Sequence, residues 1–580
     1  MSRNDWSSRA GWAIDLAAAL VLTAINLALR WSYLRVPTFD TDESEYQAAA
    51  AYALSVGRSG FVYPIYGYTI EGYRLVAELF GKYNMLPVRL GVVLAASVVA
   101  GLIYVWLKRD VSRLVALATA ASFSVFAIKF NGYMANREWP CAITLLLGAW
   151  LFVRAQRGPE NLRGWGVFVA GFVAALSLYF KEQTAYIMLA TPIWLVLKAV
   201  DERRLQPWAQ SGFCYLAGGL AAGLLYVVPY AIEGTLALHI ESELRFGQVY
   251  AFHKPVIYTN PYRNNWLGRF FVIRDARHQL LLAYGWLAYY LVRLMARWVR
   301  RWRGRTMPAD DRRPRGWRSA DTALLLTCYI ATSAAAVAMG NRWSIGYFLL
   351  WFPFAALAGG YGLQAFVGLL STRWRKRAPW IFAAFVALGC VSTHWTFAAA
   401  ALVAGVLTVS MVAATRCNEP WRCLTPLACM AIPLGYFDAT QSLQSTYRDY
   451  RRADVSEDVR AFFVARRLSP GERMFVWGSM PDLYRISGLD PSIRQIVCSG
   501  FDDSFFEPKA FPEEMANLYM AELRSRPPQV VVAGPEKNAR LGGATPYPLD
   551  DFLQLDALIR SEYTRAASFP DCTIYERKSN

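Results

Sequence analysis

The sequence predicts a polytopic α-helical membrane protein that ends in a small α/β domain outside the membrane. The chain of 580 residues is 55% hydrophobic and has a mean hydropathy of +0.21. Its apolar residues come in runs of about twenty, which as helices are long enough to cross ~30 Å of hydrocarbon. The composition becomes mixed near the end of the chain. We therefore expect residues 1–437 to form a transmembrane domain and residues 438–580 a separate domain.

The apolar runs define the spans. The first run, residues 11–34, is too long for a signal peptide and no small-residue cleavage site follows it, so we expect it to remain as a span. In all we predict about thirteen spans. They lie near residues 11–34, 85–107, 113–129, 139–154, 164–180, 184–200, 211–232, 279–296, 320–339, 344–370, 379–395, 397–415 and 424–437.

The distribution of Lys and Arg predicts the orientation of these spans. Alternate connections are rich in basic residues, as is typical of cytoplasmic loops. These connections are residues 108–113, 154–163, 201–204, 297–318, 371–377 and 415–423. The N-terminus is then cytoplasmic. The loops at 37–57 and 233–278 and the C-terminal domain face the extracytoplasmic side.

The C-terminal region reads as a small α/β domain. Short β-rich runs, "MFVWG" (474–478), "RQIVC" (494–498) and "QVVVAG" (529–534), alternate with helix-like stretches and Pro or Gly. At roughly 140 residues the region is long enough for its own core. No Gly-rich phosphate loop opens a helix, so we assign it no chemistry. Cys498 and Cys572 are a candidate disulfide on an oxidising side of the membrane.

Composition and motif spacing exclude two other classes of site. The formal charge of +18 would suit a nucleic-acid surface. Topology and anionic lipid headgroups explain it better, because the longest Arg run joins two spans and has no aromatic platform for bases. The four histidines are scattered and Cys417 and Cys423 lack a second ligand pair, so we expect no zinc site.

An acidic cluster follows the first span. Asp40, Asp42, Glu43 and Glu45 lie in "PTFDTDESEYQ" (37–47). One interpretation is a helix cap, with Asp42 as N-cap of a helix beginning near Glu43 and Glu45 completing a capping box. That interpretation leaves Asp40 unexplained, and unpaired carboxylates at a membrane boundary repel one another. The cluster therefore predicts a bound cation, a metal or a proton to transfer.

Basic residues interrupt the short outward connections, where the topology rule depletes them. They are Lys129, Arg137, Lys181 and Arg342, and two stand next to acids as Arg137-Glu138 and Lys181-Glu182. Each alone is compatible with a side chain that anchors a helix end. Together they predict a ring of cations and carboxylates at the outer leaflet that suits an anionic lipid-linked substrate. A sugar on a lipid phosphate needs cations on that phosphate and a base for the acceptor hydroxyl.

These features resemble the GT-C class of membrane glycosyltransferases. The order is a first span, an outward "DE" loop leading into an interfacial helix, an acid after an Arg before the fourth span, a "KEQ" turn and an outward tail. The resemblance is closest to family 39, which includes protein O-mannosyltransferases and bacterial transferases that add aminoarabinose to lipid A. It implies an inverting transfer of a sugar from a polyprenyl-phosphate donor.

The resemblance also implies roles for individual residues. The catalytic acids fall on Asp42, the first choice for the base, on Glu43, and on Glu138, where some members have Asp. The donor phosphate falls to Arg137, Lys181, Arg342 and Tyr347. Further candidate substrate contacts are Asp40, Glu182, Tyr66, Arg263 and Arg269. Carboxylates of the first loop suit a divalent metal, but the resemblance does not demand one, so we predict no cofactor.

The sequence departs from the lipid A transferases after the interfacial helix. They have a Lys-Pro-Pro-Leu type stretch where this chain has "YPIYGYTIEGYRL" (63–75). Its tyrosines fit either sugar stacking or an aromatic belt at the membrane interface. The stretch 245–278 fits either a cover over the substrate or an amphipathic segment on the headgroups.

We therefore expect a multi-pass protein of the bacterial inner membrane that transfers a sugar to an envelope lipid, glycan or protein. The membrane lipids are its surroundings, and no nucleic acid is expected as a partner. A flippase or a ligase or polymerase of polyprenyl-linked glycans shares the basic patch but does not need the paired acids. A secondary transporter would place its charges inside the spans. A structural protein would tolerate loss of both Asp42 and Glu138.

Overall fold

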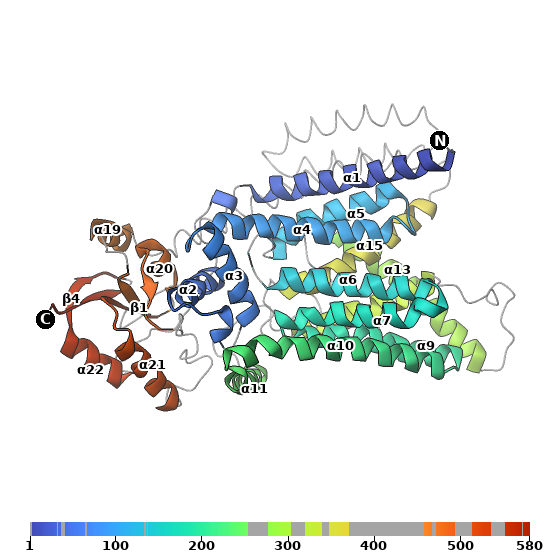
Figure 1. Ribbon diagram of the computed structural model, residues 1–580. Coiled ribbons are helices and arrows are strands. Elements are labelled where there is room, and N and C mark those ends of the chain that lie inside the picture. Colours follow the sequence, from blue (N-terminus) through green and yellow to red (C-terminus); the bar gives the residue numbers. More distant parts are fainter. Residues whose placement is uncertain are drawn as a thin grey trace, which may run out of the picture.

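A bundle of long helices carries a small sheet domain at one end (Figure 1). The computed structural model describes residues 3–31, 33–35, 41–63, 66–130, 132, 135, 137–252, 277–302, 319–338, 347–369, 457–466, 471–478, 480–493, 513–534, 552–570 and 572–579. The predicted spans at 379–395, 397–415 and 424–437 lie outside these residues. The boundary between the two predicted domains, near 437, lies outside them too and stays a prediction.

Outside the sheet domain, the described residues form fourteen α-helices. They are α1 (Arg3–Arg30), α2 (Thr41–Ser55), α3 (Gly67–Phe80), α4 (Met85–Leu107), α5 (Arg113–Phe126), α6 (Glu138–Arg157), α7 (Glu160–Ala175), α8 (Thr184–Met188), α9 (Ala190–Glu202), α10 (Gln206–Glu233), α11 (Leu236–Phe252), α13 (Arg277–Trp302), α14 (Ser319–Ala338) and α15 (Phe348–Leu369). Short 3-10 helices η1 (Tyr33–Arg35), η2 (Gly60–Val62), η3 (Ala127–Phe130) and η4 (Leu176–Tyr179) join some of them.

Eight helical segments among the described residues are long and apolar enough to cross a membrane. They are 12–30, 85–107, 138–157, 160–179, 184–202, 206–233, 320–337 and 348–365. Each coincides with a predicted span, so the multi-pass architecture is confirmed. The predicted span at 113–129 is the shorter apolar helix Val115–Phe126, and the one at 279–296 lies in α13. The total of thirteen stays a prediction.

Local signals fix where several helices begin and end. The Asn84 side chain accepts from Leu86 N–H at the start of α4, and the Ser112 side chain accepts from Val115 N–H at the start of α5. Pro207 stands in the first turn of α10, where its missing N–H costs nothing. Gly234 ends α10 in the left-handed region at φ +73°, which glycine adopts without strain.

Ion pairs join helices and connections at one end of the bundle. At the end where α1 begins, Lys108 pairs with Asp15 at 2.5 Å and Arg157 pairs with Asp110 at 2.9 Å. These contacts fall in or beside the basic connections 108–113 and 154–163 predicted to be cytoplasmic. The sheet domain lies at the opposite end, beyond α2 and α3 (Figure 1). The separation of the N-terminus from the sheet domain agrees with the predicted topology; which end is cytoplasmic stays a prediction.

Within the described part of the chain, the sheet has five strands in the order β2-β1-β3-β5-β4. They are β1 (Arg473–Trp477), β2 (Asp490–Pro491), β3 (Val530–Ala533), β4 (Tyr563–Ser568) and β5 (Thr573–Arg577), with helices α19 (Glu457–Ala465), α20 (Asp482–Ser487), α21 (Glu513–Ser525) and α22 (Leu553–Glu562). β1 runs parallel to β2 and β3, and β5 runs antiparallel to β3 and β4. The predicted strands at 474–478 and 529–534 are present as β1 and β3. The run 494–498 and Cys498 lie outside the described residues, so the candidate disulfide stays a prediction.

The two faces of the sheet bury different partners. Phe475, Trp477 and Val531 point to one face and pack with residues of α21 and α22. Met474, Val476, Val530 and Val532 point to the other face, and their apolar cluster includes the buried alanine face of α2. Period-two alternation along β1 and β3 produces this division. The core of the sheet domain is therefore shared with a helix from the beginning of the chain, which sequence analysis did not anticipate.

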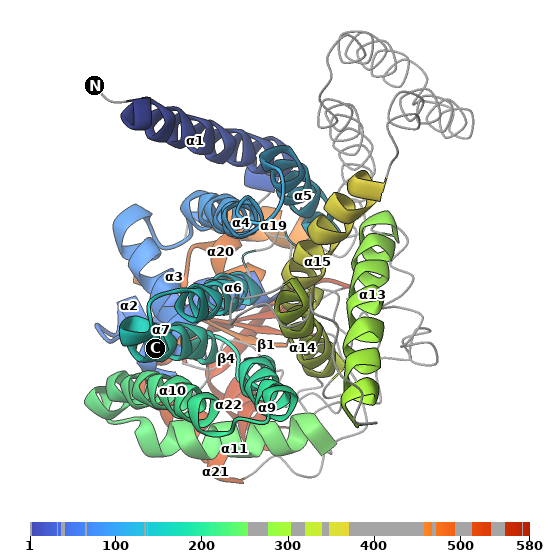
Figure 2. The same ribbon diagram turned by 90° about the vertical axis from the view of Figure 1, so that its right-hand side faces the viewer.

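Helix α11, at this end of the bundle, does not follow the direction of the bundle. Figure 1 shows α11 nearly end-on beside the end of α10, and Figure 2 shows it running crosswise to α9 and α10. α11 forms the first part of the predicted outward loop 233–278. It includes residues 245–252 of the stretch predicted to be either a cover or an amphipathic segment, and the choice between the two stays a prediction. Residues 253–276, with Arg263 and Arg269, lie outside the described part.

Candidate active site

A buried ion pair forms the centre of the site. Glu138 is the first residue of α6, and Lys181 lies in the turn after η4, 43 positions further along the chain. The side chains of both are almost fully buried, and the Lys181 ammonium donates a hydrogen bond to Glu138 Oε1. Lys181 Nζ also lies 3.5 Å from the ring centroid of Tyr347, just before α15. Three predicted residues from separate connections thus meet at one point.

Arg137 extends this centre toward α2 and α3. Its guanidinium lies 3.8 Å from the ring centroid of Tyr66 and 6.0 Å from that of Tyr46, which belongs to α2. Arg137 Nη1 donates to the carbonyl of Phe180 at 3.4 Å, next to Lys181. Tyr66 therefore contacts a cation of the site, an arrangement that neither the sugar-stacking nor the belt interpretation of the tyrosines described.

Glu43 lies in a second buried cluster. Its carboxylate accepts hydrogen bonds from Tyr33 Oη, from Arg89 Nη2 at 3.2 Å and from Ala135 N–H at 2.8 Å. Glu43 and Arg89 are both buried, at 1% and 0% side-chain exposure. A carboxylate that holds three donors at a buried position is well suited to fix its surroundings.

Asp42 precedes Glu43 in the first turn of α2. The helix begins at Thr41, so Asp42 is inside the helix and the predicted capping box, with Asp42 as N-cap and Glu45 at the third helical position, is wrong. The helix begins two residues earlier than predicted, which is a small shift, and Asp42 and Glu43 lie in the same turn. The side chain of Asp42 and the whole of Asp40 lie outside the described residues.

The chain just before Glu138 joins the two clusters. Ala135 gives its N–H to Glu43, and its carbonyl accepts from Tyr73 Oη at 3.0 Å. Further back, the Gly132 carbonyl accepts from the buried Arg30 at 2.8 Å. Three side chains from α1, α2 and α3 therefore hold the segment that leads into Glu138. Glu43 and Glu138 therefore lie at the same end of the bundle.

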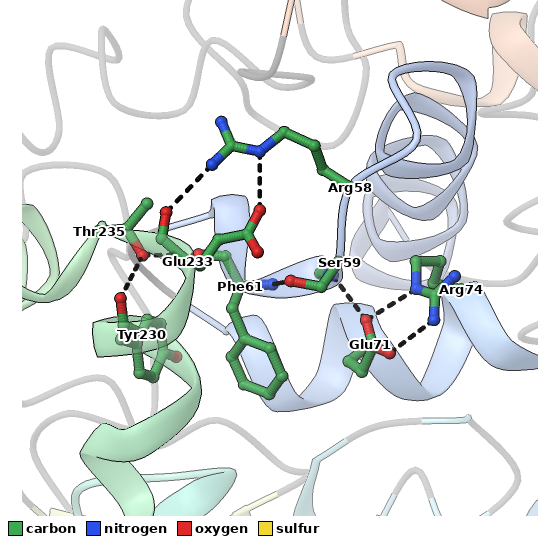
Figure 3. Close-up of polar contacts among 9 residues, drawn as sticks. Arg58, Ser59, Phe61, Glu71, Arg74, Tyr230, Glu233 and Thr235 are labelled. Carbon is green, nitrogen blue, oxygen red and sulfur yellow. Dashed lines mark hydrogen bonds and ion pairs between the residues drawn. The ribbon is translucent and has the colours of Figure 1, made fainter.

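Polar contacts also fix α3 beside the site (Figure 3). Arg58 donates from Nε to Glu233 Oε1 at 2.7 Å, which joins the α2–α3 connection to the end of α10. Glu71 accepts from Gly60 N–H at 2.6 Å and from Arg74 Nε at 2.8 Å. Burial opposes ionisation of Glu71, but these hydrogen bonds outweigh it and hold its pKa below the usual value.

Glu243 on α11 is a site residue that sequence analysis missed. Its pKa is raised from 4.5 to about 7, mainly by burial and also by the neighbouring charge of Glu182, against an opposing effect of Arg137. Glu182 itself is exposed, in the turn next to Lys181. Two carboxylates within electrostatic range of Arg137, one of them titrating near neutrality, are typical of functional sites.

Signals for the missed residues were present in the sequence. Arg89 is a lone cation in an otherwise apolar predicted span, and such a residue generally faces the protein interior and pairs there. Glu243 lies in a stretch where Leu236, Ile240 and Leu244 recur every four positions with acids between them, as on an amphipathic helix. Assigning 233–278 as one loop concealed that pattern.

Other predictions remain untested. Arg342, Arg263 and Arg269 lie outside the described residues, so the structure does not bring them to the site or away from it. Within the described ranges, no three His, Cys, Asp or Glu side chains gather to hold a metal ion. Because Asp40 and the Asp42 side chain are not among them, the expectation of no metal stays a prediction.

Comparison with known proteins identifies a matching family model and solved structures of similar fold. Residues 64–232 match the family model described as dolichyl-phosphate-mannose-protein mannosyltransferase. Crystal structures of ArnT from Cupriavidus metallidurans bound to undecaprenyl phosphate and in the apo state are similar, with TM-scores of 0.53 and 0.54. Both are 15% identical in sequence, and the alignments cover 97% and 98% of this chain and 98% of each ArnT chain. No curated protein sequence matches.

These findings confirm the predicted fold class. The chain is a polytopic helical membrane protein with the ArnT-like, GT-C-like architecture and a small C-terminal sheet domain. The resemblance to GT-C family 39 holds at the level of the fold and of the matched family segment.

Proposed function

We propose that this protein is a membrane glycosyltransferase that moves a sugar from a polyprenyl-phosphate donor to a cell-envelope acceptor. The observation that carries the proposal is the convergence of Arg137, Glu138 and Lys181 beside the first turn of α2, at the end of a GT-C-like bundle. One ArnT structure binds undecaprenyl phosphate, which supports a donor of this class. The reaction would take place at the extracytoplasmic face of the bacterial inner membrane.

The geometry supports a division of labour among the residues. Arg137 and Lys181 supply positive charge for the donor phosphate, with Tyr347 packed against the Lys181 ammonium. Charge on that phosphate builds up as the bond to the sugar breaks, so fixed cations lower the barrier. Glu138 holds the Lys181 ammonium in place through their hydrogen bond.

The acids of α2 complete the scheme. Asp42 acts as the general base that takes the proton from the acceptor hydroxyl. Glu43, held by Arg89, Tyr33 and Ala135, positions the turn on which Asp42 lies. A single base and a direct displacement at the sugar would invert its configuration. Whether the sugar is a hexose or a pentose is left open by this scheme.

Substituting the base tests the proposal. In purified protein supplied with undecaprenyl-phosphate-linked sugars, Asp42→Asn should abolish sugar transfer and leave donor binding and thermal stability unchanged. Glu78→Gln is the matched control, because it makes the same acid-to-amide change at a 55% exposed position of α3. Unchanged transfer in Asp42→Asn would exclude Asp42 as the base. A flippase or ligase would then be the better assignment. Comparing the envelope glycans of cells with and without the protein would test that assignment.

A further inference from the structure

The first turn of α2 is bound directly to the sheet domain. Ser44 follows Glu43, and its hydroxyl donates to Asp482 Oδ1 at 2.8 Å. Asp482 is the first residue of α20 and lies 438 positions along the chain from Ser44. Ser44 is 3% exposed and the Asp482 side chain 26%, so this contact is partly shielded from water. Such shielding makes a hydrogen bond to a carboxylate strong and directional.

The other end of α2 is bound to the same domain. Arg526, just after α21, donates from Nη2 to Ser55 Oγ at 3.0 Å, and its guanidinium lies 4.9 Å from the ring centroid of Tyr52. Between these two contacts α2 presents small side chains, Ala49 and Ala53, to the sheet. Small residues let the helix backbone approach closely. The two contacts therefore fix both the position of α2 along its axis and its rotation about that axis.

Two neighbouring residues in the first turn of α2 are thus held by different parts of the protein. Glu43 is bound to Arg89 of the membrane bundle, and Ser44 is bound to Asp482 of the sheet domain. Adjacent residues of an α-helix point about 100° apart, so these two contacts oppose rotation of the turn in either direction. Asp42 belongs to that turn, and its backbone is positioned by both.

We propose that Asp482 is a positioning residue for the transfer reaction: through Ser44 it fixes the first turn of α2, and with it the base Asp42, relative to the bound donor. This inference rests on the proposed function and gives the C-terminal domain a part in catalysis. Misplacement of a reacting group by about 1 Å can reduce a rate a hundredfold, so a contact of this kind acts on kcat.

The test compares Asp482→Ala, Asp482→Asn, Ser44→Ala and the double variant Ser44→Ala/Asp482→Ala in the full-length protein. Each is assayed for kcat and for donor KM with undecaprenyl-phosphate-linked sugar. Hydrogen exchange is measured at the amides of residues 45–48, which close the first turn of α2. Lys82→Ala is the control. It removes the ion pair of Lys82 with Asp490 at 2.8 Å, which crosses the same interface away from that turn.

We expect Asp482→Ala and Ser44→Ala to lower kcat roughly 10- to 100-fold with donor KM changed less than about twofold. The double variant should be no worse than Ser44→Ala, because both remove one hydrogen bond. Asp482→Asn should restore most of kcat, because its amide oxygen still accepts from Ser44. Amide exchange at 45–48 should accelerate in Asp482→Ala and not in Asp482→Asn or Lys82→Ala.

Other results would overturn the inference. Equal losses of kcat in Lys82→Ala and Asp482→Ala would mean that docking of the domain in general is what matters. Faster exchange with unchanged kcat would show that Asp482 holds the turn without serving the reaction. A wild-type protein that transfers no sugar would reject the proposed function, and the exchange measurement would still decide whether Asp482 fixes the turn.

Discussion

At the scale of single residues, the site depends on charges that are buried in pairs. Lys181 and Glu138 are both nearly inaccessible and compensate each other. Removing two charges from water is costly, so such a pair adds little net stability as a unit, but breaking it leaves one uncompensated charge. A buried pair of this kind is retained for what it does at the site.

The pair gives a first prediction at this scale. Lys181→Met should destabilise the protein by about 3–5 kcal/mol, because it leaves the Glu138 carboxylate buried without its cation. The double variant Glu138→Gln/Lys181→Met should recover much of that loss. Lys82→Met is the control, since the Lys82 side chain is 41% exposed and its ion pair is worth about 0–1 kcal/mol. Unfolding in detergent measures all three; equal effects of the two Lys variants would contradict the prediction.

Glu243 gives a second residue-scale prediction, on pH. Its pKa is raised from 4.5 to about 7 in the folded protein, so the folded state binds a proton that the unfolded state releases between these values. Stability therefore falls as pH rises from about 4.5 to about 7, by roughly 3 kcal/mol at most, and changes little above that. The melting temperature of wild type should fall across this window relative to Glu243→Gln. Parallel curves for the two proteins would refute the assignment.

At the scale of elements, glycines set how closely two spans approach. Gly171 of α7 and Gly218 of α10 each face backbone of the other helix, and a Cβ added at either position would lie within 3.0 Å of it. Helices in membranes pack through such small residues, because lipid offers no hydrophobic drive for association.

Gly218→Ala should therefore weaken the bundle. The added methyl group must displace the backbone of Phe168, and overpacking of this kind costs typically about 1–3 kcal/mol or more. Gly223→Ala, one and a half turns further along α10, meets nothing within 4 Å and should be neutral or slightly stabilising. Thermal unfolding in detergent compares the two variants. A Gly218→Ala protein as stable as Gly223→Ala would show that the helices separate without cost.

At the scale of the whole molecule, the membrane bundle and the sheet domain share one apolar cluster. Tyr46 and Ala50 of α2 are buried together with Met474, Val476 and Val532 of the sheet. The catalytic turn proposed here is thus placed between the two halves of the protein (Figure 1). This arrangement links folding of the sheet domain to the geometry of the site.

The shared core leads to a prediction about the sheet domain by itself. Residues 457–580 expressed alone should lack a cooperative thermal transition and should bind hydrophobic dyes, because the sheet face covered by α2 is then exposed to water. In the full-length protein the same strands should exchange their amide hydrogens slowly. A sharp two-state transition of the isolated segment would show that its core is complete without α2.

Local patterns along the chain were enough to predict the class of the protein and its main elements. Runs of apolar residues define spans, and short β-rich runs define β1 and β3, because each of these signals is local along the chain. The sequence also singled out Arg137, Glu138 and Lys181, since cations and acids at the outer ends of spans are unusual.

Which of these residues meet is visible only in the folded chain. The bonded residues are far apart in the sequence: Glu138 and Lys181 by 43 positions, Glu43 and Arg89 by 46, and Ser44 and Asp482 by 438. The periodicity of the sequence does not predict such pairs, because they depend on how the helices pack and on which residue compensates a buried charge. The same reason hid Glu243, whose shifted pKa arises from burial, and α2, whose alanine face completes a core built from the other end of the chain.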